Sequence, residues 1–246
     1  MKTIEILGIP FAQVTQKDAL ELLENFLLEP RNHIITTPNP EGVMQARRNP
    51  EFAEALRSAD LSLADGTGIV MASFLHSREN RLPERVRGVD TTFALFESLA
   101  RKREFTAYFL GGRPGVSEQA KANMEARFPS LKVVGHHHGF FSPDDETTIL
   151  SEINALAPEV LLVCTGMPRA EIWATRNRDI NARLTLCVGG TIDIMAGTVS
   201  HAPAFMRKIG LEWLWRLMRQ PTRATRMLDI PRFIASVARQ ACSGHR

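Results

Sequence analysis

The sequence predicts an α/β fold in which helices cover both faces of a doubly wound, largely parallel sheet, with a helical appendage at the carboxyl end. Short β-rich runs alternate with longer amphipathic patterns through most of the 246 residues. Several of the short runs are apolar throughout, which is typical of strands that are covered on both faces. Beyond about Gly190 this alternation stops, and only helical patterns remain.

Six segments are expected to form the strands of this sheet: residues 33–37, 61–65, 106–112, 131–137, 159–166 and 184–190. The first of them, "HIITT", is followed by two prolines, neither of which can donate a ladder hydrogen bond. We therefore expect this strand to stop near Thr37. Pro40 and Glu41 then suit the first turn of a helix, where proline needs no donor and a carboxylate meets the positive helix end.

Amphipathic helices are expected between the strands. In "NPEFAEALRSA" Asn49 suits the N-cap and Pro50 the first helical position. Segments 90–102 and 115–128 repeat apolar residues at spacings of three and four. Alternation of strands and helices in this order predicts right-handed crossovers between parallel strands.

The chain divides into a main domain, residues 1–200, and a basic helical appendage, residues 201–246, in which Pro203, Pro221 and Pro231 mark helix starts. Residues 204–246 contain nine Lys and Arg against two Asp and Glu, whereas the rest of the chain contains 21 against 25. A weakly acidic body with a basic appendage indicates an anionic partner. Nucleic acid, a phosphate-bearing ligand and an anionic lipid surface all fit that description.

The composition narrows the class of protein. The hydrophobic share of 44% and the charged share of 23% are those of a globular protein. Three scattered cysteines suggest a reduced, cytoplasmic compartment and no structural zinc. The amino terminus lacks the apolar core of a signal peptide, and no run reaches the roughly 18 apolar residues of a spanning helix. Three consecutive histidines, 136–138, do not predict a metal site, because neighbours on a strand point to opposite faces.

Glycines follow four of the six expected strands, at the edge where ligands of open α/β sheets bind. Such turns let a phosphate approach backbone N–H groups at a helix start. The sequence therefore predicts a nucleotide or another phosphorylated ligand. The candidate binding residues at these strand ends are Gly111, Gly112, Gly166, Glu171, Gly190 and Asp193.

The segment "ADGTG" places Asp65 at the end of the second expected strand. Its glycines could serve only as turn residues, and Asp65 could simply cap the helix that follows. However, Thr37 and Asn39 follow a strand that is expected to lie nearby. We therefore favour a site in which Asp65, Thr37 and Asn39 lie together.

The appendage carries four arginines, Arg216, Arg219, Arg223 and Arg226, at helical spacing. Apolar residues, including two tryptophans, accompany them. This pattern fits either a solvated face over a packed helix or an amphipathic segment at a membrane surface. The apolar residues suit a lipid interface better than a nucleic-acid backbone.

Seven motifs, in order across nearly the whole chain, resemble the WecG/TagA/CpsF family of bacterial glycosyltransferases. They are "TPNPEGVMQARRNPEF" (37–52), "ADLSLADGTGIV" (59–70), "LPERVRGVD" (82–90), "FLGGRPGVSEQA" (109–120), "TGMPRAEIW" (165–173), "VGGTIDIMAGT" (188–198) and "APAFMRKIGLEWLWRLMRQPTRATR" (202–226).

This resemblance implies a Rossmann-like core and a metal-independent, inverting glycosyltransferase without a cofactor. The enzyme would move a sugar of the ManNAc, ManNAc-uronate or glucose type from a UDP donor to a sugar linked to polyprenyl diphosphate. The pathway would be cell-surface polysaccharide biosynthesis of the exopolysaccharide or teichoic-acid kind. It would work in the cytoplasm, peripherally at the inner face of the cell membrane, where the appendage binds and helps to complete the active site. Whether several copies assemble is left open.

The resemblance also assigns roles by position. Asp65 would be the general base that accepts the proton of the attacking hydroxyl, with Thr37 and Asn39 beside it to hold a sugar. Arginines would bind a diphosphate, either of UDP or of the lipid carrier, since no metal neutralises the leaving group. They are Arg85, Arg216, Arg223 and Arg226. Two positions depart from the family pattern near the expected donor site: Ala170 replaces a common Gln, and His201 a common Arg.

Two other functional classes compete with this hypothesis. A dinucleotide-dependent oxidoreductase would also contain strand–glycine–helix units, but no strand here precedes GxGxxG with an acidic residue about 20 positions later. A non-catalytic nucleic-acid binder would use the basic appendage, whose apolar content argues against that role. We therefore expect a glycosyltransferase that binds no nucleic acid.

Overall fold

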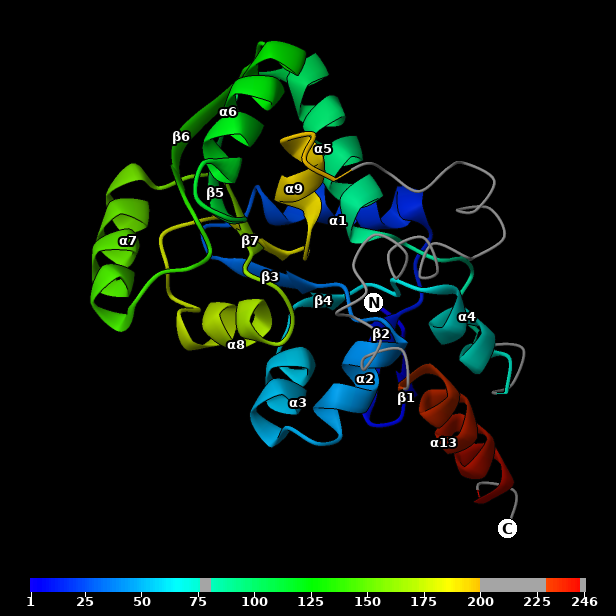
Figure 1. Ribbon diagram of the computed structural model, residues 1–246. Helices are drawn as coiled ribbons and strands as arrows, with labels where there is room; N and C mark the ends of the chain where they lie inside the picture. Colours follow the sequence, from blue (N-terminus) through cyan, green and yellow to red (C-terminus); the bar gives the residue numbers. More distant parts are fainter. Residues whose placement is uncertain (76–80, 200–228, 244–246) are drawn as a thin grey trace.

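The computed structural model describes residues 1–75, 81–199 and 229–243 of the chain (Figure 1). Its centre is a six-stranded sheet, all parallel, with the strand order β4-β3-β8-β7-β5-β6. The strands are β3 (His33–Thr36), β4 (Leu61–Ser62), β5 (Phe105–Gly111), β6 (Leu131–His137), β7 (Val160–Cys164) and β8 (Leu184–Cys187). All six predicted strands are confirmed, and the fold is the Rossmann-like α/β architecture that was expected.

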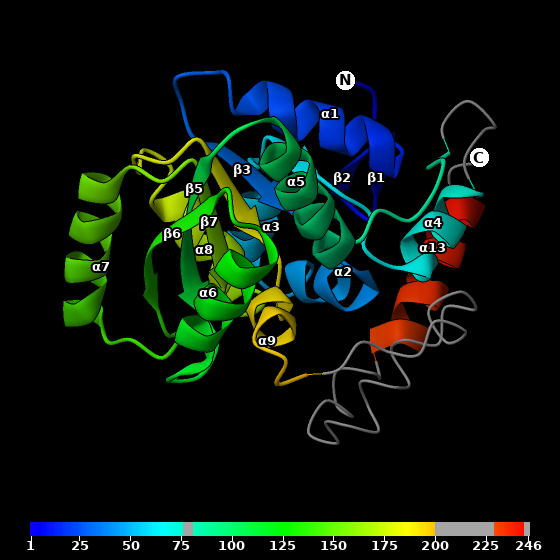
Figure 2. The same ribbon diagram turned by 90° about the horizontal axis from the view of Figure 1, so that it is seen from above.

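Helices cover both faces of this sheet (Figures 1 and 2). On one face lie α1 (Gln16–Phe26), α5 (Gly88–Lys102), α6 (Val116–Arg127) and α9 (Thr191–Met195). On the other lie α7 (Pro143–Leu156) and α8 (Arg169–Arg176). The remaining helices are α2 (Pro40–Ala46), α3 (Pro50–Arg57), α4 (Thr67–Ser73) and α13 (Asp229–Ser243).

The wholly apolar strands fill two cores at once, because successive side chains of a strand point to opposite faces. In β7, Val160 and Leu162 belong to the core beneath α1, α5, α6 and α9. Leu161 and Val163 belong to the core beneath α7 and α8. This double burial explains the lack of polar alternation in the strand.

A third core lies beyond the edge strand β4, and it includes elements that the sequence did not predict. An antiparallel hairpin of β1 (Thr3–Ile6) and β2 (Ile9–Ala12) packs there with α2, α3, α4 and α13. Its turn places Leu7 at a φ of 51° and Gly8 at a φ of 84°. Leucine rarely adopts a positive φ, so the usual Asn-Gly or Asp-Gly signal of such a turn is missing.

The predicted helix starts are confirmed at two positions. Asn49 caps α3, its side chain accepting a hydrogen bond from the N–H of Phe52, and Pro50 is the first helical residue. Asn39 caps α2 in the same way, with Pro40 in the first turn. In each case the cap satisfies a backbone donor that a helix start leaves without a partner.

Of the basic appendage, the structure describes α13 alone, which begins two residues before the predicted start at Pro231. This helix packs on the body, with Phe233 and Val237 buried in the third core beside α2 and α4. His201, Arg216, Arg223 and Arg226 lie outside the described residues, so the division at residue 200 and the roles of these side chains stay predictions.

Within the described residues, no helix is both long enough and apolar enough to cross a membrane.

Candidate active site

A cavity of about 320 Å³ opens at the carboxyl edge of the sheet, and residues that follow all six parallel strands line it. The described part of the chain contains ten of the predicted site residues, and eight of these line the cavity. The eight are Thr37, Asn39, Asp65, Gly112, Gly166, Glu171, Gly190 and Asp193.

Two predicted residues are not part of this lining. Arg85 is half-buried in the loop before α5. Gly111 ends β5 against the backbone of β7, where a Cβ would lie 2.6 Å from the carbonyl oxygen of Cys164. Its φ is 152°, a conformation that other residues rarely adopt. Gly111 therefore allows two strands to approach each other beneath the cavity, and Gly112 is the glycine that reaches its surface.

Thr37 lies where three elements meet. Its hydroxyl donates a 3.1 Å hydrogen bond to the backbone oxygen of Cys187, at the end of β8. A Cβ on Gly88, the first residue of α5, would lie 3.0 Å from both the hydroxyl oxygen and the methyl carbon of Thr37. The start of α5 can therefore come this close to Thr37 only with glycine at position 88.

Asp65 is held beside Asn39 by close packing between the end of β4 and the start of α2. Cβ atoms on Gly66 and Gly68 would lie 3.0 and 2.8 Å from ring carbons of Pro40. The N-cap of α4 is Gly66, so Asp65 does not occupy the capping position itself. Asp65 is half-buried on the cavity wall, where a substrate can reach it.

The side-chain amide of Asn39 already makes one structural hydrogen bond. Its carbonyl oxygen caps α2 by accepting the N–H of Gly42 at 2.9 Å. The cap fixes the orientation of the amide, so that a structural role and a role in the cavity coexist in one residue. Glu41, which we expected to be mainly structural, lies in the first turn of α2 and also lines the cavity.

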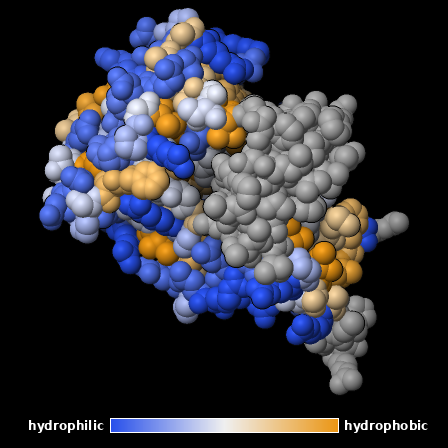
Figure 3. Space-filling view, in the orientation of Figure 1, coloured by the Kyte–Doolittle hydropathy of each residue, from blue (hydrophilic) through white to orange (hydrophobic). Residues whose placement is uncertain are grey.

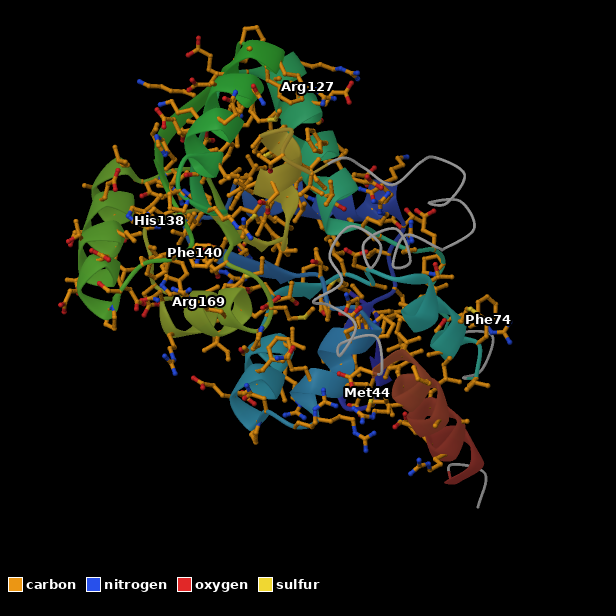
Figure 4. The ribbon with its side chains drawn as sticks, viewed as in Figure 1. Met44, Phe74, Arg127, His138, Phe140 and Arg169 are labelled. Carbon is orange, nitrogen blue, oxygen red and sulfur yellow. The ribbon has the colours of Figure 1, made fainter. Side chains whose placement is uncertain are left out.

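The rim of the cavity includes an aromatic side chain that sequence reasoning missed. Phe140, in the loop between β6 and α7, is 69% exposed and lines the cavity (Figure 4). Arg169 holds this loop, its guanidinium donating hydrogen bonds to the backbone oxygens of Gly139 at 2.8 Å and Phe141 at 3.3 Å. The N–H of Gly139 also donates to the backbone oxygen of Gly112 at 2.8 Å. A flat apolar ring is thus presented to a ligand from an anchored loop.

Two buried side-chain oxygens at the cavity have no hydrogen-bond partner among the described residues. They are the hydroxyl oxygen of Thr165 and the Oε2 atom of Glu171. Glu171 is only 4% exposed, and burial raises its pKa to about 7. Buried polar atoms normally have partners, so these two oxygens indicate that a polar ligand belongs here.

The charges of the lining are mixed. Besides Glu171, its carboxylates are Glu41, Asp65 and Asp193, and its cations are Arg113 and Arg169. Arg113 follows the glycine turn at the end of β5, shortly before α6 begins. Neither arginine was predicted, because neither stands in a position that sequence spacing marks. The described residues contain no group of three or more His, Cys, Asp and Glu that could hold a metal ion.

Ala170, which stands where the resembled family commonly has Gln, lies beneath the cavity. Ala170 is 1% exposed and packs with Ile34 and Trp173 in the core under α8, and it is not part of the lining. Its neighbours Arg169 and Glu171 do line the cavity. His201, the other departure, lies outside the described residues.

Comparison with known proteins matches the chain to a family of enzymes. The family model described as "Glycosyl transferase WecG/TagA/CpsF family" matches residues 4–246. Similar curated proteins include three from Staphylococcus aureus, of the strains MRSA252, MW2 and NCTC 8325. Each is 29% identical over 239 residues, which is 96% of this chain and 92% of the relative. Each is named N-acetylglucosaminyldiphosphoundecaprenol N-acetyl-beta-D-mannosaminyltransferase.

Proposed function

Because the chain belongs to the WecG/TagA/CpsF family of glycosyl transferases, we propose that it moves a sugar from a UDP donor to a sugar linked to polyprenyl diphosphate, with inversion. The observation that carries the proposal is the convergence of Thr37, Asn39 and Asp65 on one cavity beside the glycine turns of the neighbouring strands. A hydroxyl, an amide and a carboxylate there suit a sugar. The turns suit its diphosphate.

The proposed reaction is a direct displacement. The acceptor hydroxyl attacks the anomeric carbon while Asp65 accepts its proton, and the bond from that carbon to the phosphate oxygen breaks with its electron pair leaving on UDP. Thr37 and Asn39 hold the reacting sugars. One inversion at the anomeric carbon follows, since the attacking and leaving oxygens lie on opposite sides.

The departing diphosphate needs positive charge and N–H donors. Among the described residues of the lining, Gly112, Gly166 and Gly190 offer close backbone approach, and Arg113 offers a cation. We keep Arg85, Arg216, Arg223 and Arg226 as further candidates for the diphosphate of UDP or of the lipid. Phe140 is suited to stack on the uracil base, because an exposed ring on an anchored loop offers a large flat contact.

The names of the relatives support N-acetylmannosamine as the donor sugar and a GlcNAc-diphosphate lipid as the acceptor. Such an acceptor has its carrier in a membrane, so we propose that the protein works at the inner face of the cell membrane. Supporting this, Met71, Phe74 and Leu75 of the α4 segment are 65, 53 and 50% exposed. Figure 3 shows apolar surface on the side of the molecule where α4 and α13 lie. Ile234 of α13, which packs beside α4, is 62% exposed.

The proposal is tested by incubating the full chain with a panel of UDP-sugars and a polyprenyl-diphosphate-GlcNAc analogue. Release of UDP and the mass of the lipid product would be followed together. We expect turnover with N-acetylmannosamine as the donor sugar. If no donor is turned over while NAD or an oligonucleotide binds tightly, the transferase proposal fails, and one of the competing functions takes its place.

A further inference from the structure

One carboxyl group of the cavity has surroundings unlike those of the others. Glu171 belongs to the first turn of α8, is 4% exposed and lines the cavity, and its Oε2 atom has no hydrogen-bond partner among the described residues. A buried carboxylate normally has a cation or several N–H donors around it. Glu171 has neither such a cation nor such a set of donors among the described contacts.

A buried thiol lies beside Glu171. Cys187 of β8 lies close enough for the charge of Glu171 to raise the pKa of the thiol, after the larger effect of burial, and Cys164 of β7 lies beside it. Both thiols are buried and stay neutral at ordinary pH, since burial also raises the pKa of Cys164 to about 12. The other charged groups of the lining, from four neighbouring segments and α8 itself, are Glu41, Asp65, Asp193, Arg113 and Arg169.

Of the two cations, Arg169 is committed to the backbone oxygens of Gly139 and Phe141, and Arg113 belongs to the turn after β5. Neither ion-pairs with Glu171 in the structure. Burial therefore favours the neutral, protonated form, which can donate one hydrogen bond and accept others.

Glu171 and Thr37 share a neighbour on the cavity lining. The charge of Glu171 acts on the thiol of Cys187, and the backbone oxygen of Cys187 accepts the hydroxyl hydrogen bond of Thr37. Because Thr37 is proposed to hold a reacting sugar, we expect Glu171 to reach that sugar too.

We propose that Glu171 binds the donor sugar as an uncharged carboxylic acid, by donating a hydrogen bond to a sugar oxygen, and that it thereby selects neutral donor sugars over uronates. This inference rests on the proposed function and deepens it. The selection acts through the fraction of Glu171 that is ionised: a uronate carboxylate beside that ionised group would meet repulsion, in a cavity whose lining already contains three other carboxylates against two arginines. An N-acetylhexosamine or a hexose offers hydroxyl and carbonyl oxygens that accept a hydrogen bond without that cost.

The affinity for the neutral UDP-sugar should fall as the pH rises, because the protonated form of Glu171 is the one that binds. Below pH 7 the Glu171 carboxyl is mostly protonated. Above pH 7 the fraction of protein molecules with a protonated Glu171 falls about tenfold per pH unit. We expect the Kd of UDP-N-acetylmannosamine for the wild-type full chain to be about tenfold weaker at pH 8 than at pH 6. The diphosphate diester of a UDP-sugar keeps its charge over this range, so the ligand does not contribute to the change.

The experiment measures Kd by calorimetry at pH 6, 7 and 8 for UDP-N-acetylmannosamine and UDP-N-acetylmannosaminuronate. Glu171→Gln retains a hydrogen-bond donor that does not titrate, so it should bind the neutral sugar with the same Kd at all three pH values. Glu54→Gln, on the exposed surface of α3, is the matched control and should keep the wild-type pH dependence. The wild type should bind the uronate more weakly than the neutral sugar at pH 8, where Glu171 is mostly ionised, and the difference should be smaller at pH 6.

The outcomes separate the inference from the proposed function. Neutral-sugar binding with an equal pH dependence in the wild type and in Glu171→Gln would overturn the role of Glu171 while leaving the transferase in place. Tighter binding of the uronate than of the neutral sugar at pH 8 would do the same. Should neither UDP-sugar bind at any pH, the proposed function and the inference would both fail. The wild-type pH series does not depend on any variant folding.

Discussion

Two acidic residues on the same cavity wall differ in their surroundings, and this difference suits two roles. Asp65 is half-buried at the end of β4, with its backbone N–H bonded to the oxygen of Leu63. Glu171 is buried in the first turn of α8, and its Oε2 atom has no hydrogen-bond partner among the described residues. A half-exposed carboxylate can stay ionised and accept a proton, whereas a buried one is held neutral and can donate a hydrogen bond.

Replacing the proposed base tests the first of these roles. Asp65→Asn should lower the transfer rate by about 10²–10⁴-fold, because the amide cannot accept the acceptor's proton in the transition state. Donor binding should change little, since the amide keeps the shape and polarity of the side chain. Steady-state UDP release and calorimetric binding of the UDP-sugar measure the two effects. Asp179→Asn, an exposed site, is the control, and a near-normal rate for Asp65→Asn would exclude Asp65 as the base.

The exposed ring at the rim leads to a second prediction at this scale. Phe140→Ala should weaken binding of UDP by about 1–3 kcal/mol, because the stacking contact with the base is lost, while Phe140→Tyr should retain it. Titration calorimetry with UDP measures the change. Phe74→Ala, on the exposed end of α4, removes a ring of the same size outside the cavity lining and should leave the Kd unchanged. Equal binding by Phe140→Ala and the wild type would remove the stacking role.

Among the elements, α13 shows how the carboxyl-terminal end of the chain is fixed to the body. Its first residue, Asp229, accepts two hydrogen bonds from the guanidinium of Arg48, at 2.9 and 2.6 Å. Arg47 donates to the hydroxyl of Ser236 at 2.8 Å, about two turns further along the helix. Phe233 and Val237 fill the third core between these polar contacts. The helix is therefore anchored by both apolar burial and a paired fork of hydrogen bonds.

The ion pair gives the docking of α13 a pH dependence. The hydrogen bonds from Arg48 lower the pKa of Asp229, so the stabilisation is present above the unfolded-state pKa and is lost as the pH falls through the lowered folded-state pKa. Asp229→Asn should cost roughly 1 kcal/mol of unfolding free energy at pH 7, since Arg48 is half-exposed and water screens the pair. Denaturant unfolding at pH 7 and at pH 3 measures it.

At pH 3 the difference between the variant and the wild type should be smaller than at pH 7, because the wild-type carboxyl gains protons as the pH approaches its lowered pKa. Asp179→Asn is again the control for loss of an exposed carboxylate. A difference in stability that stays constant down to pH 3 would contradict an electrostatic origin. These point variants are preferable to deleting residues 204–246, because deletion would also uncover the apolar surface against which Phe233 and Val237 pack.

For the molecule as a whole, the catalytic sheet and the exposed apolar residues of α4 lie on different elements of one body. The α4–α13 side stands opposite α7 in both ribbon views (Figures 1 and 2). The cation Arg81 lies over the ring of Phe74 at 5.0 Å, and α13, which packs beside α4, carries the exposed Arg232. Apolar side chains beside arginines are typical of a surface that meets anionic lipid headgroups.

The membrane proposal gives a prediction at this scale. The double variant Met71→Ser, Phe74→Ser should bind anionic vesicles at least about tenfold more weakly than the wild type, because the apolar area that enters the interface is reduced. Sedimentation with phosphatidylglycerol vesicles measures the affinity. Leu28→Ser removes an 82% exposed leucine at the end of α1 and should have no such effect. Unchanged binding by the double variant would assign the membrane contact to another surface.

The sequence by itself determined the strands of the sheet and the place of the site. Its apolar runs and glycine turns mark six strand ends, and parallel strands bring their carboxyl ends to the same edge, so Thr37, Asn39 and Asp65 could be expected to lie together. These features are local in the chain, because a proline, a cap or a glycine turn acts on the residues beside it.

Only the tertiary structure decided the order of the strands, the β1–β2 hairpin, the anchored Phe140 loop and the burial of Glu171. Each of these depends on contacts between residues far apart in the chain. The "IITTPNPEGV" segment shows both cases: its prolines predicted where β3 stops, but the position of Glu41 on the cavity lining did not follow from them. Desolvation is a property of everything that surrounds a side chain, so no local pattern could have revealed that Glu171 is the carboxyl group whose pKa burial raises to about 7.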